Sequence, residues 1–448
     1  MQDPTKLPRL LHPALALALF WALIYGFYWV APIQQTPPIS ARGLLFVGAM
    51  MLVYAISSAL AASGPTNESV NVPDSSLATH SHPASDTLTR LFLTIGILGT
   101  GLNMFARLQS IDDFSFADAA VLRAERAQLL LEAADPASSV FTGIAFLCYP
   151  AGFVALTAAM LRFESLSQST RVLSGLYAVL IFLHGIAAGG RSSLLVLILL
   201  VAISLYVRRC RGLPAVPRSK LLILIMSGAI VGFLGYSTAV WQVRADLAEF
   251  EVEDFLAHAD QVWGVIPTPA LERFADAIDN QSLLVSVTSS LFYVTQSLAV
   301  VERILAARDL PVLLGAYHID VVAALLRAFP ASAAFLGQGY DKLLQENIYG
   351  FFAGAWGALY IDFGLAGSVA IIALWGSLSG FAYRTARRSL YSDRVTAYIY
   401  SLYAILTSFV SPPLGFSNSA MTFAWFVLFY FGIRRIERGR PNHALHPA

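Results

Sequence analysis

Residues 1–32, MQDPTKLPRLLHPALALALFWALIYGFYWVAP, decide the fold class of this chain. Lys6 and Arg9 precede an apolar run that continues to about Ala31. A helix needs roughly 20 apolar residues to cross the hydrocarbon core of a bilayer. Because the run reaches that length, it predicts a membrane-spanning helix that acts as an uncleaved signal anchor.

The composition of the whole chain favours the same environment. Of the 448 residues, 57% are hydrophobic and only 13% are charged, whereas a soluble domain carries about 25% charge. The net charge of +1 offers no basic surface for nucleic acid. Cys148 and Cys210 are too few for a disulfide framework or a cysteine-based zinc site. An all-α, polytopic integral membrane protein is therefore predicted.

Ten apolar segments are long enough, or nearly long enough, to be membrane spans. They cover about residues 11–31, 44–62, 91–108, 140–161, 172–188, 193–207, 221–241, 367–383, 395–410 and 420–433.

The basic residues predict how these spans are oriented, because short cytoplasmic loops are enriched in Arg and Lys. Three clusters fall on one side of a ten-span chain: Arg208, Arg209, Arg211, Arg218 and Lys220; Arg384, Arg387, Arg388 and Arg394; and Arg434, Arg435, Arg438 and Arg440. Both termini are then cytoplasmic. The predicted parts are N-terminal spans 1–63, a flexible cytoplasmic linker 64–88, central spans 89–241 with an outward helix 109–136, a large outward loop 242–346, C-terminal spans 347–433 and a cytoplasmic tail 434–448.

The large loop between spans seven and eight is the most unusual part of the chain. It carries six basic and fourteen acidic residues, a net charge of about −8. This charge is typical of an outward loop, and the length favours a substrate-handling domain, although the acidity by itself follows from the positive-inside bias. Residues 283–308 and 318–329 have helical apolar spacing, which predicts amphipathic helices that lie on the membrane surface or dip into it.

Two outward segments place arginines where they could bind an anion. In GIAAGGRSSLLVL, residues 185–197, Arg191 follows a glycine turn and precedes the next helix. A guanidinium beside a helix N-terminus suits phosphate oxygens, whereas the alternative is an arginine that only reaches the lipid headgroups. Arg123 and Arg126 lie on the polar face of the outward helix, which could also be a simple amphipathic cover.

Asp362 interrupts an apolar run of about thirty-five residues, which is too long for one straight span. We therefore predict a half-helix that ends near Tyr360, a turn at Gly364 and a span that begins near Gly367. A carboxylate at this boundary needs a partner, or it caps the helix that follows.

Three parts of the sequence resemble the oligosaccharide repeat-unit polymerases, also called O-antigen polymerases of the Wzy type. The turn at Gly189 to Ser193 is similar to a hairpin of that family, and DDFSFADAAVLRAER, residues 112–126, is similar to its first outward helix. The third likeness is an Asn-x-Tyr and Asp-aromatic-Gly-x-x-Gly pattern, preceded by residues 292–295. Its positions are Asn347, Tyr349, Tyr360, Asp362, Phe363, Gly364 and Gly367.

The resemblance implies a glycosyltransferase of lipopolysaccharide or related polysaccharide biosynthesis, multi-pass in the inner membrane, with its site facing the periplasm. It would transfer a growing chain from undecaprenyl diphosphate onto a new lipid-linked repeat unit. A chain-length regulator protein is a further expected partner. The rivals are an O-antigen ligase or another lipid-linked-sugar transferase and, more distantly, a polysaccharide exporter.

The implied reaction assigns roles to the outward residues. Arg191 and Arg244 are expected to stabilise the leaving diphosphate, and Arg123 and Arg126 are the next candidates for this role. Asp362 and His318 are the candidates for a base that deprotonates the acceptor hydroxyl. The remaining expected substrate contacts are Tyr293, Asn347, Tyr349 and Tyr360. No metal-ligand spacing is present in the sequence, so we expect no metal and no cofactor.

Overall fold

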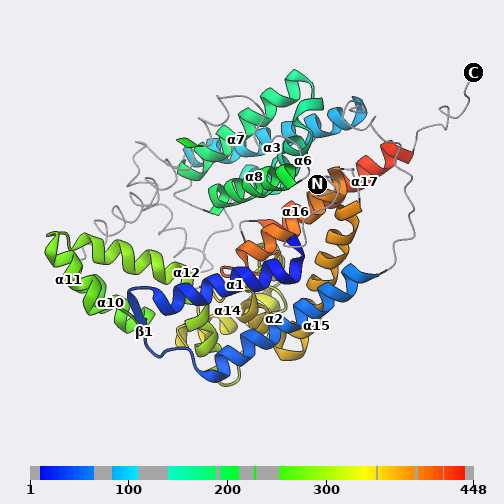
Figure 1. Ribbon diagram of the computed structural model, residues 1–448. Helices are drawn as coiled ribbons and strands as arrows, with labels where there is room; N and C mark the ends of the chain where they lie inside the picture. The colour runs from blue at the N-terminus through cyan, green and yellow to red at the C-terminus, as the bar shows by residue number, and fades with distance from the viewer. Residues whose placement is uncertain are drawn as a thin grey trace, which may run out of the picture.

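The computed structural model describes residues 11–64, 83–108, 140–187, 192–210, 227–228, 252–349, 352–388, 392–416 and 418–438. The regular secondary structure of these residues is helical apart from two short strands, β1 (Ile33–Gln35) and β2 (Val265–Pro267). The N-terminal and central helices are α1 (Pro13–Val30), α2 (Ala41–Ser63), α3 (Pro83–Leu108), α5 (Val140–Cys148), α6 (Ala151–Leu161), α7 (Gln168–Ala187) and α8 (Ser192–Cys210). The predicted all-α class is confirmed for these residues (Figure 1).

The second half of the described chain begins in the large loop. Its helices are α10 (Val252–His258), α11 (Pro269–Ala277), α12 (Ser282–Ala306), α13 (Asp320–Arg327) and α14 (Pro330–Gln345). The last helices are α15 (Gly354–Arg388), α16 (Ser392–Thr407) and α17 (Ser419–Arg438).

Seven helical segments in the described chain are long and apolar enough to cross a membrane. They are Pro13–Val30, Ala41–Ser63, Ser85–Ala106, Gly143–Leu161, Ser192–Cys210, Leu283–Ala306 and Gly354–Arg387. Leucines on α1 and α2, such as Leu19, Leu45 and Leu60, are exposed, as expected for helix faces that meet lipid. A helix satisfies all its backbone hydrogen bonds internally, which is what a lipid environment requires.

The seven segments differ from the ten predicted spans. The predicted fifth, ninth and tenth spans form helices α7, α16 and α17 but are not among the seven. The predicted seventh span, 221–241, lies outside the described residues except for 227–228. α3 begins at Pro83, inside the segment predicted as linker, because Asp86 pairs with Arg90 at 3.2 Å and accepts a hydrogen bond from Ser167 Oγ at 2.8 Å.

α12, predicted from residues 283–308 as an amphipathic helix that lies on the membrane surface or dips into it, is one of these seven helices by length and composition. Two of its hydroxyl side chains bond back to the helix itself. Ser289 Oγ donates to the carbonyl oxygen of Val285 at 2.6 Å, and Thr295 Oγ1 donates to that of Leu291 at 3.0 Å. Both side chains are buried, so these residues do not mark a face exposed to water.

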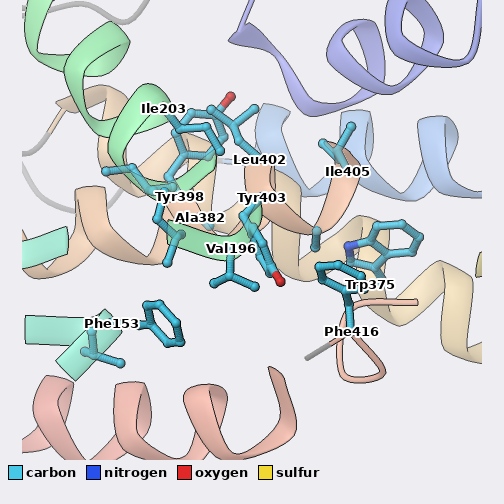
Figure 2. Close-up of a cluster of buried hydrophobic side chains, with 14 of the residues drawn as sticks. Phe153, Val196, Ile203, Trp375, Ala382, Tyr398, Leu402, Tyr403, Ile405 and Phe416 are labelled. Carbon is cyan, nitrogen blue, oxygen red and sulfur yellow. The ribbon is translucent and has the colours of Figure 1, made fainter. Parts of the chain in front are cut away.

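The central core joins α1, α2, α15 and α16 through large aromatic side chains. The ring centroids of Trp21 and Trp356 are 5.6 Å apart, and those of Trp356 and Trp375 are 5.9 Å apart. Figure 2 shows Trp375 in this core together with Tyr403 and Phe416.

α2 and α15 approach closely along their length. A Cβ atom on Gly376 would lie 2.6 Å from the backbone carbonyl oxygen of Tyr54 and 2.1 Å from Ser57 Oγ, so only glycine fits there.

The described contacts distinguish two ends of the bundle. At one end β1 pairs antiparallel with β2 of the large loop, and Ser40 donates its backbone N–H and its hydroxyl to Glu302 at 3.0 and 2.9 Å. At the other end the ring of His12 packs against Tyr383, 5.2 Å between centroids. The large loop and the arginine cluster that begins at Arg384 therefore lie at opposite ends.

The opposite placement makes a topology prediction testable. Reporter fusions after Arg211, Arg388 and Arg438 should report the cytoplasm, and fusions near Arg273 and Asp135 should report the outside, because arginine-rich loops are retained on the cytoplasmic side. Paired phosphatase and fluorescent-protein fusions give the measurement. A cytoplasmic signal at Arg273 would contradict an outward site in the large loop.

Candidate functional site

The site is built around a break in α15. Gly364 has φ 64° and ψ −173°, which are not helical, so α15 consists of two helical parts that meet there. Glycine adopts this positive φ without steric cost. The turn predicted at Gly364 is thus confirmed, and Asp362 lies in the last turn of the first part.

A short loop segment, residues 313–318, wraps around Asp362. The backbone N–H of Leu314 donates to the carbonyl oxygen of Asp362 at 2.8 Å. Oδ1 of the carboxylate accepts from the N–H of Gly315 at 3.0 Å and from that of Tyr317 at 2.9 Å. Oδ2 accepts from the N–H of His318 at 3.2 Å. Leu314 and Gly315 have positive φ values of 56° and 95°, a conformation that lets successive N–H groups converge on one anion.

The imidazole of His318 completes the set of partners. Its Nδ1 contacts Asp362 Oδ2 directly, and its ring packs edge-on against Phe363, 6.2 Å between centroids. Asp362 has no exposed surface, and the side chain of His318 is 5% exposed. Because the partners recorded for the carboxylate all lie in residues 315–318, the alternative that Asp362 caps the following helix is wrong.

The pairing decides which nitrogen of His318 is available. A neutral imidazole carries one proton, and the carboxylate holds that proton on Nδ1. Nε2 then has the free lone pair. Within the described chain no hydrogen bond is recorded to Nε2. The arrangement therefore orients His318 as a base: the buried carboxylate of Asp362 holds Nδ1, and Nε2 can accept a proton.

Removing the Asp362 carboxylate should destabilise this region. In Asp362→Ala three backbone N–H groups and the imidazole lose their acceptor, and each buried donor without a partner costs about 1–3 kcal/mol. We expect a loss of at least about 2 kcal/mol in the free energy of unfolding, with a smaller loss for Asp362→Asn, which keeps one acceptor oxygen. Thermal unfolding of purified protein measures both. The exposed Asp341→Ala on α14 is the control and should leave the transition unchanged.

A second, smaller hydrophobic core supports the loop segment. It joins the end of α12, residues 313–316, α13, α14 and the first part of α15. Its buried residues are Val300, Ile304, Leu313, Ala316, Ala323, Leu336, Leu343, Ile348, Ala353, Ala358 and Ile361. Tyr349 and Tyr360, both predicted substrate contacts, pack against this core.

Tyrosines and one arginine surround the same core on its loop side. Tyr340 donates its hydroxyl to the carbonyl oxygen of Ala316 at 2.7 Å, and its ring meets that of Tyr349 at 5.1 Å between centroids. The guanidinium of Arg327 lies 5.6 Å from the Tyr340 ring centroid. Burial raises the pKa of Tyr340 to about 12 and also raises the pKa of Tyr349, so both phenols stay neutral hydrogen-bond donors.

Two other predicted substrate contacts have partners elsewhere in the described chain. Asn347 has a positive φ of 52°, and its carbonyl oxygen accepts from Arg303 Nη1 at 2.8 Å. Tyr293 on α12 packs edge-on against Phe352, 5.1 Å between centroids. The structure therefore brings together Asp362 and His318, with Tyr349 and Tyr360 on the adjoining core.

Arg303 and Glu302 were missed in the sequence, where they are one unremarkable pair in a loop. Arg303 also donates to the carbonyl oxygen of Trp263 at 2.7 Å, so its guanidinium joins two distant parts of the large loop. Glu302 holds the start of α2 through Ser40. Both side chains fix the position of α12 and hence of the core beneath His318.

The four predicted arginines, Arg123, Arg126, Arg191 and Arg244, lie outside the described residues. Within the described ranges, no group of three or more His, Cys, Asp or Glu side chains could hold a metal ion.

The comparisons with known proteins give no relative for this chain. No family model, no curated protein and no solved structure matches it.

Proposed function

We propose that the chain is a lipid-linked oligosaccharide polymerase that works at the periplasmic face of the inner membrane. The observation that carries the proposal is the His318–Asp362 pair at the break in α15. It supplies an oriented base at the position where the sequence resembles the Asp-aromatic-Gly pattern of that family. The apolar helices provide the membrane setting in which a polyisoprenyl-linked substrate is found.

The reaction requires a base and a stabilised leaving group. The acceptor hydroxyl oxygen attacks the anomeric carbon of the donor chain, a glycosidic bond forms, and the bond from that carbon to the diphosphate oxygen breaks. The hydroxyl proton moves to Nε2 of His318. Undecaprenyl diphosphate leaves with the negative charge, which Arg191 and Arg244 stabilise.

His318 is the base in this proposal, and Asp362 is a positioning residue. Both were candidates in the sequence. The carboxylate of Asp362 is fully buried and accepts four hydrogen bonds, so it has no free face for a substrate hydroxyl. His318 keeps some exposure and a free Nε2. Asp362 acts on the reaction only through the orientation and tautomer of His318.

A deletion strain tests the proposal against its rivals. Loss of a polymerase leaves lipopolysaccharide core that carries a single repeat unit, because ligation of one unit still proceeds. Gel separation of lipopolysaccharide from the deletion strain and from the complemented strain gives the readout. Bare core would instead indicate a ligase or an exporter, and an unchanged ladder would reject a role in this polysaccharide.

Purified protein provides a second test that is independent of the host. Given lipid-linked repeat units alone, it should produce chains of two and more units together with free undecaprenyl diphosphate. A protein that moves or binds these lipids without extending them would contradict the enzymatic assignment.

A further inference from the structure

The turn from α13 to α14, residues 324–335, exposes an unusually apolar surface. Leu325 is 62% exposed, Phe329 is 64% exposed and Phe335 is 42% exposed. Among these twelve residues Arg327 is the only charged one. We call residues 324–335 the apolar tip. A large exposed apolar surface of this kind marks a contact with a membrane or another protein.

The position of α14 along the bundle favours a membrane. The core beneath α13 and α14 includes Ala358 and Ile361, and both belong to the segment Gly354–Arg387 that is long and apolar enough to cross a bilayer. In Figure 1, α10 and α11 lie beyond the β1 end of α1, whereas α14 lies at a level between the two ends of α1.

Exposed apolar side chains also surround the break in α15. Val312 is 42% exposed, Leu314 is 61% exposed and Leu365 is 57% exposed. Leu314 is bonded through its N–H to Asp362, and a Cβ atom built on Gly364 lies 3.9 Å from Val312. Leu365 follows directly on α15, so these side chains continue the apolar face that α15 presents to its surroundings.

The other end of α14 carries polar and charged residues, with Leu344 55% exposed among them. Lys342 and Glu346 form an ion pair at 3.2 Å, and Asp341 and Gln345 are exposed. One short helix therefore begins in an apolar surface and ends in a charged one. This division matches the boundary between hydrocarbon and headgroups, across which an amphipathic element inserts by about 5–10 Å.

We propose that α13 and α14 form a helix pair whose apolar tip inserts into the lipid bilayer at the large-loop end of the bundle. Lipid is the occupant because α13 and α14 pack on the first part of the apolar segment Gly354–Arg387, and because α14 begins in the apolar tip and carries its ion pair at the other end. Arg327, the charged residue of the tip, has its guanidinium 5.6 Å from the ring centroid of Tyr340 on α14.

The insertion has a consequence for His318, which lies two residues before α13. Insertion of the apolar tip would hold the His318–Asp362 pair at the lipid boundary, where the diphosphate of a lipid-linked donor also lies. This consequence rests on the proposed function, whereas the insertion itself does not.

Spin labels on the full chain in lipid nanodiscs test the insertion without any activity measurement. In a background with Cys148→Ala and Cys210→Ala, one label is placed at Phe329→Cys and a matched label at Gln345→Cys on the polar end of α14. In discs that hold one copy, the label at position 329 should collide often with oxygen and rarely with a water-soluble nickel complex. The label at position 345 should collide with the nickel complex.

The wild-type chain gives a second measurement that needs no variant. A phospholipid with a photoactivatable group in its acyl chain should label peptides from the apolar tip and should spare residues 338–346. Free access of the nickel complex to position 329, or absence of lipid labelling on the tip, would overturn the proposal. So would protection of position 329 from both reagents in discs that hold several copies, because a protein contact would then cover the tip.

Discussion

Replacing His318 by asparagine should reduce polymer synthesis by about a hundredfold to ten-thousandfold, the usual contribution of a general base. Asparagine can place an amide N–H close to where Nδ1 now meets Asp362, so the bonds of residues 313–318 to Asp362 can persist. It has no group at the position of Nε2. The variant should therefore fold like the wild type and still fail to take the proton of the acceptor hydroxyl.

Two measurements separate a catalytic role of His318 from a structural one. The unfolding temperature of His318→Asn should stay near that of the wild type while the rate of chain extension falls.

His258 of α10 provides the matched control, because it is an exposed histidine of the same loop whose ring packs against Trp263. His258→Ala should extend chains normally. If His318→Asn makes wild-type chain lengths at equal membrane abundance, the base lies elsewhere and His318 only supports the loop.

Much of the fold could be predicted, because a long apolar run has few possible structures other than a membrane helix. The nine predicted spans that fall in the described residues all form helices. The break at Gly364 followed from length alone, since thirty-five apolar residues exceed one span. Residues 283–308 were predicted as an amphipathic helix on or dipping into the membrane surface, and they form α12, whose length and apolar character would also suit a span. Apolar periodicity alone does not distinguish these two placements.

The site was less predictable, since it depends on contacts between distant residues. His318 and Asp362 were each singled out, but 44 positions separate them, and their pairing depends on the positive φ values at Leu314 and Gly315. Leucine gives no signal for such a conformation. The hydroxyl of Tyr340, which holds Ala316 in place, and the carbonyl-bound Arg303 were missed for the same reason: their partners are backbone atoms far along the chain.

Arg191 and Arg244 are predicted to bind the donor diphosphate from two sides, which is a separate requirement of the same reaction. A guanidinium matches phosphate oxygens with two parallel N–H groups, which the ammonium of lysine cannot reproduce. Removal of one such donor to a developing anion costs roughly 2.7–4 kcal/mol, or about a hundredfold to a thousandfold in rate. Arg191→Ala should therefore lose nearly all polymer, and Arg191→Lys should already lose most of it. Arg244→Ala should behave like Arg191→Ala.

The control for these variants is Arg387→Ala, which removes a charge from a cytoplasmic cluster with several members and should cost little. Polymer length is compared in the deletion strain complemented by each variant at equal membrane abundance. A His318→Asn, Arg191→Ala double variant should lose less than the product of the two single losses, because residues that act in one transition state are not additive. Wild-type ladders from both Arg191→Ala and Arg244→Ala would mean that these arginines only reach the headgroups. The leaving diphosphate would then need another cation, with Arg123 and Arg126 the next to test.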